Sequence, residues 1–374
     1  MSKKLKVGIL FGGKSAEHEV SLQSAKNVYD AIDREKYEPV LIGIDKSGRW
    51  LLNDESRFLI DADDPRRIRL NPSSDAVALV PQSGGTISNL SSSGNGGAID
   101  VVFPILHGPF GEDGTVQGLL KLADIPFVGA GVLASAAGMD KDMMKRLFRD
   151  AGLPIGKFRV IRTGEKIPEY KELSDELGSV VFIKPANMGS SVGVSKVHKA
   201  EEYYPAVLDA FQYDTKVIIE EYISGRELEC SVLGVAAGNN DIGSEPVASV
   251  VGEVKSRHEF YSYDAKYIDE NGAALIIPAD IPEKTVRRVQ ELAVGAFKTI
   301  CCEGLGRVDF FLKKDGTVII NEINTMPGFT RISMYPKLWE ASGISYTKLI
   351  DLLIELALER FKIEKKLKTS YQKR

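Results

Sequence analysis

The chain has 374 residues, of which 43% are hydrophobic and 27% charged, and its formal net charge is −4. This length predicts two or three domains. The slightly acidic balance excludes nucleic acid or an anionic membrane surface as the main partner. The three cysteines lack metal-ligand spacing. Apolar runs fall short of the ~18 residues of a membrane span and of a signal peptide's core. We therefore expect a reduced, cytoplasmic protein.

The first third of the chain alternates buried strands with helices. Continuous apolar runs, typical of strands covered on both faces, occupy residues 6–11, 37–44 and 98–106. Helical spacing of apolar residues occurs at 18–32 and 115–123. This alternation predicts a parallel sheet with helices on both faces and ligands at the carboxyl ends of its strands. The Gly/Ser-rich stretch 83–98 is interpreted as a surface loop without catalytic residues.

Two further regions follow. Segment 138–154 predicts a helix closed by Gly152 and Pro154, and it opens the second region. The third region is strand-rich, with helices predicted at 282–300 and 346–360. We predict an α/β fold that is α+β in its C-terminal parts. The predicted domains are N-terminal (1–132), central (133–225) and C-terminal (226–374).

Residues 7–15, VGILFGGKS, match the P-loop pattern, in which a glycine is followed after four residues by Gly-Lys-Ser. A P-loop needs a strand before its first glycine. Here three of the four intervening residues are large and apolar, so they belong in the strand itself. We interpret the segment as a Gly-Gly turn from strand to helix, which places Ser15, Glu17 and Ser21 near a positive helix N-terminus.

The segment 306–330 contains two strand-like runs flanking Asp315–Gly316, a preferred pair for a two-residue hairpin turn. Such a turn would place Asp309 opposite Glu322 and Arg307 opposite Asn324. The side-chain period of two would put all four residues on one face.

Opposed carboxylates destabilise a sheet unless a cation neutralises them, and Mg²⁺ takes one or two carboxylates together with phosphate oxygens. This pattern favours Mg²⁺ ions that bridge nucleotide phosphates. The alternative is a solvated strand face that carries acids without function. The opposite face already supplies a core, from Val308, Phe310, Leu312, Ile319 and Ile323.

Two weaker patterns precede this hairpin. A buried strand runs into Lys184 and a loop, 189–193, whose small residues let backbone N–H groups approach an anion. An ordinary hairpin loop would look similar. Residues 220–223 end another strand, where exposed backbone groups could pair with a base; a plain edge strand with surface acids is the alternative.

Taken together, these residues resemble the ATP-grasp superfamily and, within it, the D-alanine–D-alanine ligase family. The resemblance covers nearly the whole chain and rests on segments in the family's order: FGGKSAEHEVS, HGPFGEDGTVQG, VVFIKPANMGSSVGVSKV, EFYSYDAKY and NEINTMPGFTRIS. It implies a three-domain ATP-grasp architecture, with an N-terminal parallel-sheet domain for substrate and an insertion at about 50–97.

The resemblance also implies site residues. The lysines would hold the ATP phosphates, residues 220–223 would hold adenine, and Glu227 would hold ribose. The full ATP-binding set would be Lys141, Lys184, Ser190, Ser191, Glu220, Glu221, Ile223, Glu227 and Lys266. Two Mg²⁺ ions, replaceable by Mn²⁺, would be held by Asp309, Glu322 and Asn324. D-Alanine would be bordered by Glu17, His107, Arg307, Gly328, Ser333 and Met334. The catalytic set would be Glu17, Ser190, Tyr267, Arg307 and Lys266.

Some of these residues have plainer interpretations. His107 could be a satisfied structural histidine, and Glu112 could orient it or cap a helix. The polar, aromatic segment 259–272 is interpreted as a lid that carries Lys266 and Tyr267, with a plain surface loop as the alternative. Tyr267 would hydrogen-bond Ser190 and Glu17.

The implied activity joins two D-alanines through an acyl phosphate, releases ADP and phosphate, and serves peptidoglycan precursor synthesis. A D-alanine–D-lactate ligase would share this chemistry, although tyrosine at the lid position goes with D-alanine in this family. A nucleotide-binding regulator without catalysis is a third hypothesis, which the retained acids at 309 and 322 disfavour. D-Alanine and ATP are the expected partners, and a homodimer is compatible with the sequence.

Overall fold

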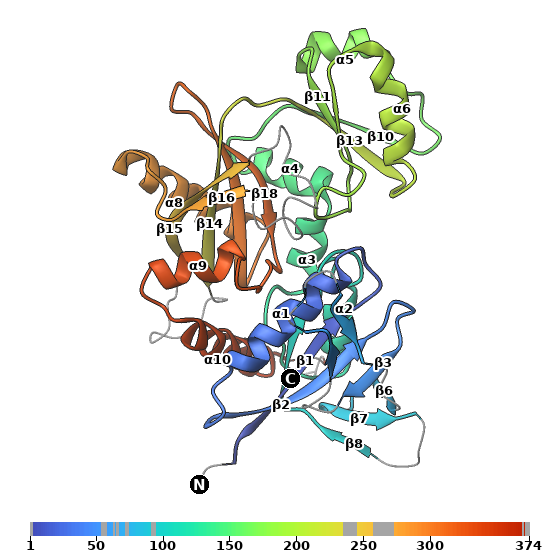
Figure 1. The fold of residues 1–374 in the computed structure, drawn as a ribbon, viewed down its shortest axis with the longest axis vertical. Coiled ribbons are helices and arrows are strands. Elements are labelled where there is room, and N and C mark those ends of the chain that lie inside the picture. The colour runs from blue at the N-terminus through green and yellow to red at the C-terminus, as the bar shows by residue number, and fades with distance from the viewer. Residues whose placement is uncertain are drawn as a thin grey trace.

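The computed structural model describes residues 3–53, 58–62, 64, 67–71, 75–90, 95–234, 245–256, 273–368 and 370. Three larger sheets, each with its own helices, form an elongated molecule (Figure 1). The fold is α/β, as predicted. The sheets lie at 5–105, 158–221 and 226–324, although this arrangement does not by itself test the predicted domain boundaries. Within the described ranges, every helix is too short or too polar to cross a membrane.

The N-terminal sheet is parallel only in part. Its parallel strands are β1 (Leu5–Gly12), β2 (Tyr37–Ile44) and β9 (Val101–Ile105). Antiparallel strands β3 (Trp50–Asn53), β6 (Asp75–Leu79), β7 (Thr86–Asn89) and β8 (Asn95–Ala98) extend it beyond β2. A small separate ladder joins β4 (Leu59–Ile60) and β5 (Arg69–Leu70).

The prediction of a surface loop at 83–98 is therefore wrong, because β7 and β8 form a hairpin there. Composition misled the prediction: a Gly/Ser-rich segment can still pair through its backbone. The rejection of a P-loop is confirmed, because β1 runs through residues 9–11, whose side chains are fully buried.

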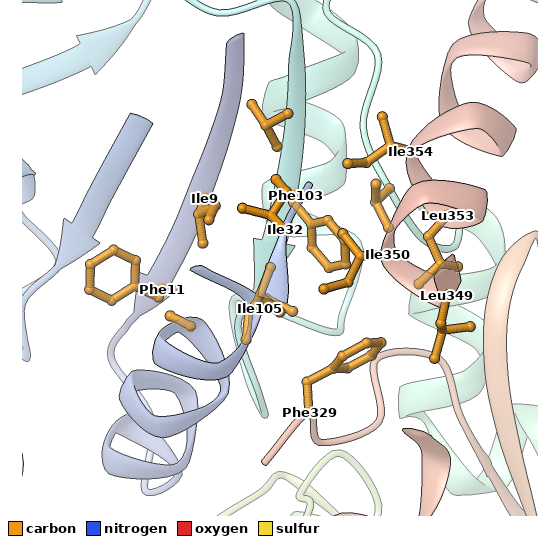
Figure 2. Close-up of a cluster of buried hydrophobic side chains, with 14 of the residues drawn as sticks. Ile9, Phe11, Ile32, Phe103, Ile105, Phe329, Leu349, Ile350, Leu353 and Ile354 are labelled. Atoms are coloured by element: carbon orange, nitrogen blue, oxygen red, sulfur yellow. The ribbon is translucent and has the colours of Figure 1, made fainter. Parts of the chain in front are cut away.

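Helices cover both faces of this sheet, as predicted. Helix α1 (His18–Ala31) packs on one face, and α2 (Thr115–Leu122) packs with β1, β2 and β9 on the other. The C-terminal helix α10 (Tyr346–Glu364) joins α1 on the first face. Figure 2 shows the side chains of α10 turned toward Phe329 and toward the strand residues Ile9 and Phe103. The helix side chains in this contact are Leu349, Ile350, Leu353 and Ile354. The C-terminal helix α10 thus completes the hydrophobic core of the N-terminal sheet.

The helix predicted within 138–154 is confirmed, and a second helix that the sequence did not predict precedes it. Helix α3 (Val132–Met139) ends at Asp140, and α4 (Lys141–Asp150) begins there, because the Asp140 carboxylate accepts the N–H groups of Asp142 and Met143. The antiparallel sheet that follows contains β10 (Phe158–Arg162), β13 (Lys216–Glu221), β11 (Val181–Pro185) and β12 (Ser195–Val197), in that order. Helices α5 (Tyr170–Leu177) and α6 (Ala200–Ala210) cover it.

The third sheet is antiparallel. Its order is β16 (Ala273–Ile276), β15 (Val247–Ser256), β14 (Arg226–Gly234), β17 (Gly304–Leu312) and β18 (Val318–Asn324). Helix α8 (Glu283–Thr299) packs on its apolar face, and α9 (Met334–Ala341) contacts β14 and β15. Helix α4 lies between this sheet and the central one (Figure 1).

Candidate active site

One pocket, with a cavity of about 380 Å³, brings the predicted site together. Every site residue named from the sequence that the structure describes lines it: Glu17, His107, Lys141, Lys184, Ser190, Ser191, Glu220, Glu221, Ile223, Glu227, Arg307, Asp309, Glu322, Asn324, Gly328, Ser333 and Met334. Lys266 and Tyr267, with the segment 259–272 interpreted as a lid, lie outside the described residues.

The hairpin turn differs from the predicted one. The N–H of Lys313 donates to the carbonyl of Thr317, and Gly316 has a φ of 84°. The loop therefore holds three residues and ends in a left-handed glycine, instead of the two-residue turn expected at Asp315–Gly316. This turn shifts the nearby register by one residue, so that Phe310 faces Ile320.

A β-bulge at Asn321 then restores the predicted pairs. Because β18 has one extra residue between Ile320 and Glu322, Asp309 faces Glu322 and Arg307 faces Asn324. The predicted site pairs are confirmed, although the predicted turn is wrong. The same shift explains why Ile320 is buried where the sequence placed Ile319 in the core.

Three carboxylates form a row across this sheet. Glu229 of β14 faces Asp309 of β17, which faces Glu322 of β18. The Arg307 guanidinium binds Asp309 through two hydrogen bonds of 2.7 Å, and its Nε lies 2.8 Å from Glu229 Oε2. Lys141 Nζ lies 3.6 Å from Glu322 Oε2. Cations are thus placed where the opposed acids need them.

A second charged group lies around Glu220 at the end of β13. Its Oε2 accepts a hydrogen bond from Lys184 Nζ at 2.6 Å, and Lys145 Nζ lies 3.1 Å from Oε1. Burial disfavours the charged carboxylate, but the two lysines hold the pKa of Glu220 at about 2. Burial likewise opposes the charge of Lys184, yet Glu220 and Glu322 raise its pKa. The Lys184 ammonium therefore stays charged although it is buried.

The strand end at 220–223 is not a plain edge, because β13 lies between β10 and β11. The N–H of Glu221 donates to the carbonyl of Lys157 at 3.1 Å. The edge-strand alternative is therefore wrong, and so is the expectation of exposed backbone N–H groups at Glu221 and Tyr222, since the Tyr222 N–H donates to the carbonyl of Val180.

On the opposite wall, the Gly/Ser loop contacts the start of α1. Ser190 Oγ donates to the Glu17 carboxylate. Ser190 and Ser191 have φ values of 49° and 61°, a left-handed conformation that is uncommon for residues other than glycine. A Cβ on Gly189 would lie 2.8 Å from Glu17 Oε2, so a larger residue there would displace the Glu17 carboxylate.

His107 is buried beside these residues. Its Nδ1 lies 3.0 Å from the carbonyl of Met326 and 3.9 Å from Glu112 Oε1, and its Nε2 lies 3.3 Å from Ser24 Oγ. Burial favours the neutral ring, but the neighbouring Glu112 carboxylate raises the pKa of His107. Both ring nitrogens have protein partners, so His107 lines the pocket and also connects neighbouring segments through these hydrogen bonds.

The loop after β18 closes the pocket floor. A Cβ on Gly328 would lie 2.8 Å from Ser333 Oγ, so a side chain at this position would displace the Ser333 hydroxyl. Ser333 Oγ accepts the N–H of Thr330 at 3.0 Å, and Met334 begins α9 with its side chain buried. The turn therefore places Gly328, Ser333 and Met334 together along the pocket.

Comparison with known proteins decides the family. Residues 6–130 match the family model described as D-ala D-ala ligase N-terminus, and residues 147–355 match the D-ala D-ala ligase C-terminus. The chain belongs to the D-alanine–D-alanine ligase family. It is 54% identical to "D-alanine--D-alanine ligase" of Oceanobacillus iheyensis, over 98% of this chain and 99% of the relative. It is 53% identical to "D-alanine--D-alanine ligase A" of Escherichia coli (strain K12), over 98% of this chain and all of the relative.

Solved ligases of this family have the same fold. The D-alanine-D-alanine ligase from Coxiella burnetii superposes with a TM-score of 0.81 at 37% identity, covering 97% of this chain and 98% of its own. The VanG D-Ala:D-Ser ligase from Enterococcus faecalis gives a TM-score of 0.82 at 35% identity, covering 95% and 100%. The three-sheet arrangement described above is therefore an ATP-grasp fold.

The ligase pocket contains two charged residues that the sequence interpretation missed. Glu229 lies two residues after Glu227 on β14, so strand alternation puts both on one face. Lys145 follows Lys141 by four residues on α4, which puts both on one helix face. These two spacings could have indicated Glu229 and Lys145 as pocket residues. They do so only after the pocket has been located, because such spacings are common on strands and helices.

The ligase pocket fits a divalent cation through oxygen donors. Two carboxylates and the amide of Asn324 converge on the hairpin face, and Asn324 Nδ2 lies 3.2 Å from Asp309 Oδ2. Within the described ranges no three His, Cys, Asp or Glu side chains form a closed metal site. Two carboxylates and an amide oxygen are the kind of donors that suit Mg²⁺, which completes its shell with phosphate oxygens and water.

Proposed function

We propose that this protein joins two D-alanines into D-alanyl-D-alanine at the expense of ATP, for peptidoglycan precursor synthesis in the cytoplasm. The observation that carries the proposal is the convergence, in one pocket, of the Asp309–Glu322 pair, the Lys184–Glu220 pair and the Glu17–Ser190 contact. The names of full-length relatives at 53–54% identity support the same reaction.

The nucleotide would lie between the central and C-terminal sheets. We infer that Lys141 and Lys184 neutralise its phosphates, that Glu220, Glu221 and Ile223 hold adenine, and that Glu227 binds ribose. Asp309, Glu322 and Asn324 would hold two Mg²⁺ ions. When bound, these ions supply positive charge to the transferring phosphoryl group. Arg307 now binds Asp309, so metal binding would leave Glu229 as its carboxylate partner.

The first D-alanine would bind with its ammonium on Glu17, whose carboxylate Ser190 orients. Its carboxylate oxygen attacks the γ-phosphorus; the bond to the bridging oxygen of ADP breaks, and an acyl phosphate forms. The amine of the second D-alanine, bordered by Ser333 and Met334, then attacks the acyl carbon. Arg307 and the Gly328 N–H stabilise the resulting oxyanion, phosphate leaves, and the attacking amine loses a proton. Lys266 and Tyr267 would close the site against water, which would hydrolyse the acyl phosphate.

The test is to measure phosphate release from ATP and Mg²⁺ with D-alanine, and to identify the product by mass spectrometry. Parallel reactions add D-lactate or D-serine, the latter because the VanG D-Ala:D-Ser ligase is 35% identical to this chain. We expect D-alanyl-D-alanine as the main product in every mixture. A dominant ester or mixed dipeptide would overturn the second-substrate assignment. ATP binding without phosphate release would favour a regulator.

A further inference from the structure

Lys145 is a buried cation that the proposed mechanism does not use. It lies on α4, one helical turn after Lys141, and is only 3% exposed. A buried lysine is costly unless its ammonium is paired and hydrogen-bonded. Lys145 has two partners, and each belongs to a different part of the pocket.

The first partner is Glu220 at the end of β13. Lys145 Nζ lies 3.1 Å from Oε1, and Lys184 donates to Oε2 at 2.6 Å. The two lysines therefore hold the carboxylate from both of its oxygens. Losing Lys145 would free one oxygen, and the carboxylate could then rotate away from its present alignment with Lys184.

The second partner is the backbone carbonyl of Asn321, to which Lys145 Nζ donates at 3.1 Å. Asn321 is the extra residue of the β18 bulge, so it stands outside the regular pairing with β17. The bulge directly precedes Glu322 and sets that residue opposite Asp309. Lys145 therefore binds the backbone at the point where the hairpin corrects its register.

We propose that Lys145 is a positioning residue that fixes the Glu220 carboxylate and the Asn321 bulge at once, and thereby aligns the phosphate-binding lysine with the metal-binding acids. The inference rests on the proposed function, because it assigns nucleotide and metal to these two places. Its location supports it: α4 lies between the two sheets that carry Glu220 and Asn321 (Figure 1).

The experiment compares Lys145→Met, Lys145→Arg and, as a matched control on the exposed face of the same helix, Arg149→Met. Calorimetry measures binding of the non-hydrolysable β,γ-imido analogue of ATP across a series of Mg²⁺ concentrations, without D-alanine. We expect Lys145→Met to lower affinity for the analogue with Mg²⁺ by about 10–100-fold, the usual effect of losing an outer partner of a metal site. The half-saturating Mg²⁺ concentration should rise with it.

Three comparisons make the result decisive. Lys145→Arg keeps the positive charge in a differently shaped donor group, so it should retain more affinity for the analogue than Lys145→Met. Arg149→Met should match the wild type. In turnover assays of Lys145→Met, the KM for D-alanine should change by less than about twofold, because the amino acid lies elsewhere in the pocket.

A purely structural Lys145 would give a different pattern. Lys145→Met would then melt at a lower temperature but bind the analogue with wild-type affinity and Mg²⁺ dependence, and this outcome would overturn the proposal. If the methionine variant does not fold, Lys145→Gln is the second neutral variant, since its amide can still donate a hydrogen bond, and the same readouts apply. Failure of the proposed function is distinguishable, because the wild type would then bind the analogue but form no dipeptide.

Discussion

The two walls of the pocket carry charge in different ways. One side, formed by β11, β13, β14, α4, β17 and β18, is the one to which we assign the nucleotide. It contains a dense set of ion pairs, in which Lys141, Lys145, Lys184 and Arg307 pair with Glu220, Glu229, Asp309 and Glu322. The other side, to which we assign the amino-acid substrate, lies at the start of α1 and the 189–193 loop and contains hydrogen bonds around Glu17 and His107. A triphosphate with its cations needs many balanced charges, whereas one amino acid needs a single well-oriented carboxylate.

This contrast predicts that changes on the nucleotide side act mainly on turnover, and that changes on the substrate side act mainly on D-alanine binding. The distinction can be measured, because an interaction made only in the transition state changes kcat, whereas uniform binding changes KM. Variants on the two sides should therefore separate in a plot of one constant against the other.

Asp309→Asn should have the largest effect. The amide cannot supply the negative charge that a divalent cation needs, and it also weakens the bidentate contact with Arg307. We expect kcat for phosphate release to fall by about a thousandfold, with a melting temperature close to the wild type. Asp315→Asn, in the exposed turn of the same hairpin, is the matched control and should keep full activity. Retained activity in Asp309→Asn would refute the metal assignment.

Glu17→Gln tests the substrate side. The amide keeps the shape but loses the charge that would hold an ammonium, a contact worth about 1.5–3 kcal/mol. The KM for D-alanine should therefore rise by roughly 10–100-fold while the KM for ATP stays near the wild type. Glu19→Gln, on the same helix, is the control, since Glu19 pairs with Lys46 outside this pocket. A fall in ATP affinity in Glu17→Gln would break the separation of the two sides.

The sequence predicted the composition of this site better than its geometry. Residue types and motif order identified both walls, and strand periodicity placed Arg307, Asp309, Glu322 and Asn324 on one face, as observed. The turn and the bulge were not predictable, because their energies depend on partners elsewhere, such as Lys145 on the Asn321 carbonyl. The turn shifts the pairing register by one residue, and the bulge at Asn321 shifts it back by one residue. The predicted pairs are therefore correct although the predicted turn is wrong.

Long-range packing was also beyond the sequence. Periodicity predicted the helix α10, but not that it would complete the N-terminal core beside β1 and β9. Nor does composition reveal that the 83–98 segment pairs as a hairpin. Both depend on which surfaces meet, which a local pattern does not encode.

Glu229→Gln should have a smaller effect than either change above. Arg307 would keep its two hydrogen bonds to Asp309 but lose its charged partner on β14. If metal binding draws Asp309 away, Glu229 is what keeps the guanidinium in place. We expect kcat to fall about tenfold with ATP affinity unchanged. A loss of Mg²⁺ affinity instead would make Glu229 a metal ligand and not a partner of Arg307. Glu253→Gln, on the neighbouring strand and bound to Arg226, is the control.

Asp351→Asn should change neither side of the pocket, because Asp351 acts on the contact between α10 and the N-terminal sheet. Asp351 of α10 accepts hydrogen bonds from Lys36, Lys348 and Tyr37, and thereby ties the C-terminal helix to the N-terminal domain. Burial opposes its charge, but these donors lower its pKa from 3.8 to about 2. A carboxylate with a depressed pKa adds stability that is present above pH 3.8 and is lost as the pH falls toward 2.

The asparagine variant should therefore melt about 1–2 °C lower at pH 7, the shift that roughly 1 kcal/mol produces at about 2.1 cal/mol/K of unfolding entropy per residue in a chain of 374 residues. It should also lose less stability than the wild type between pH 4 and pH 2, because the titrating group is gone. The kcat and both KM values should stay near those of the wild type at 25 °C. A changed KM for D-alanine would mean that α10 sets the geometry of the substrate side through the core it completes, and the two walls would then not be independent of the contact between α10 and the N-terminal sheet.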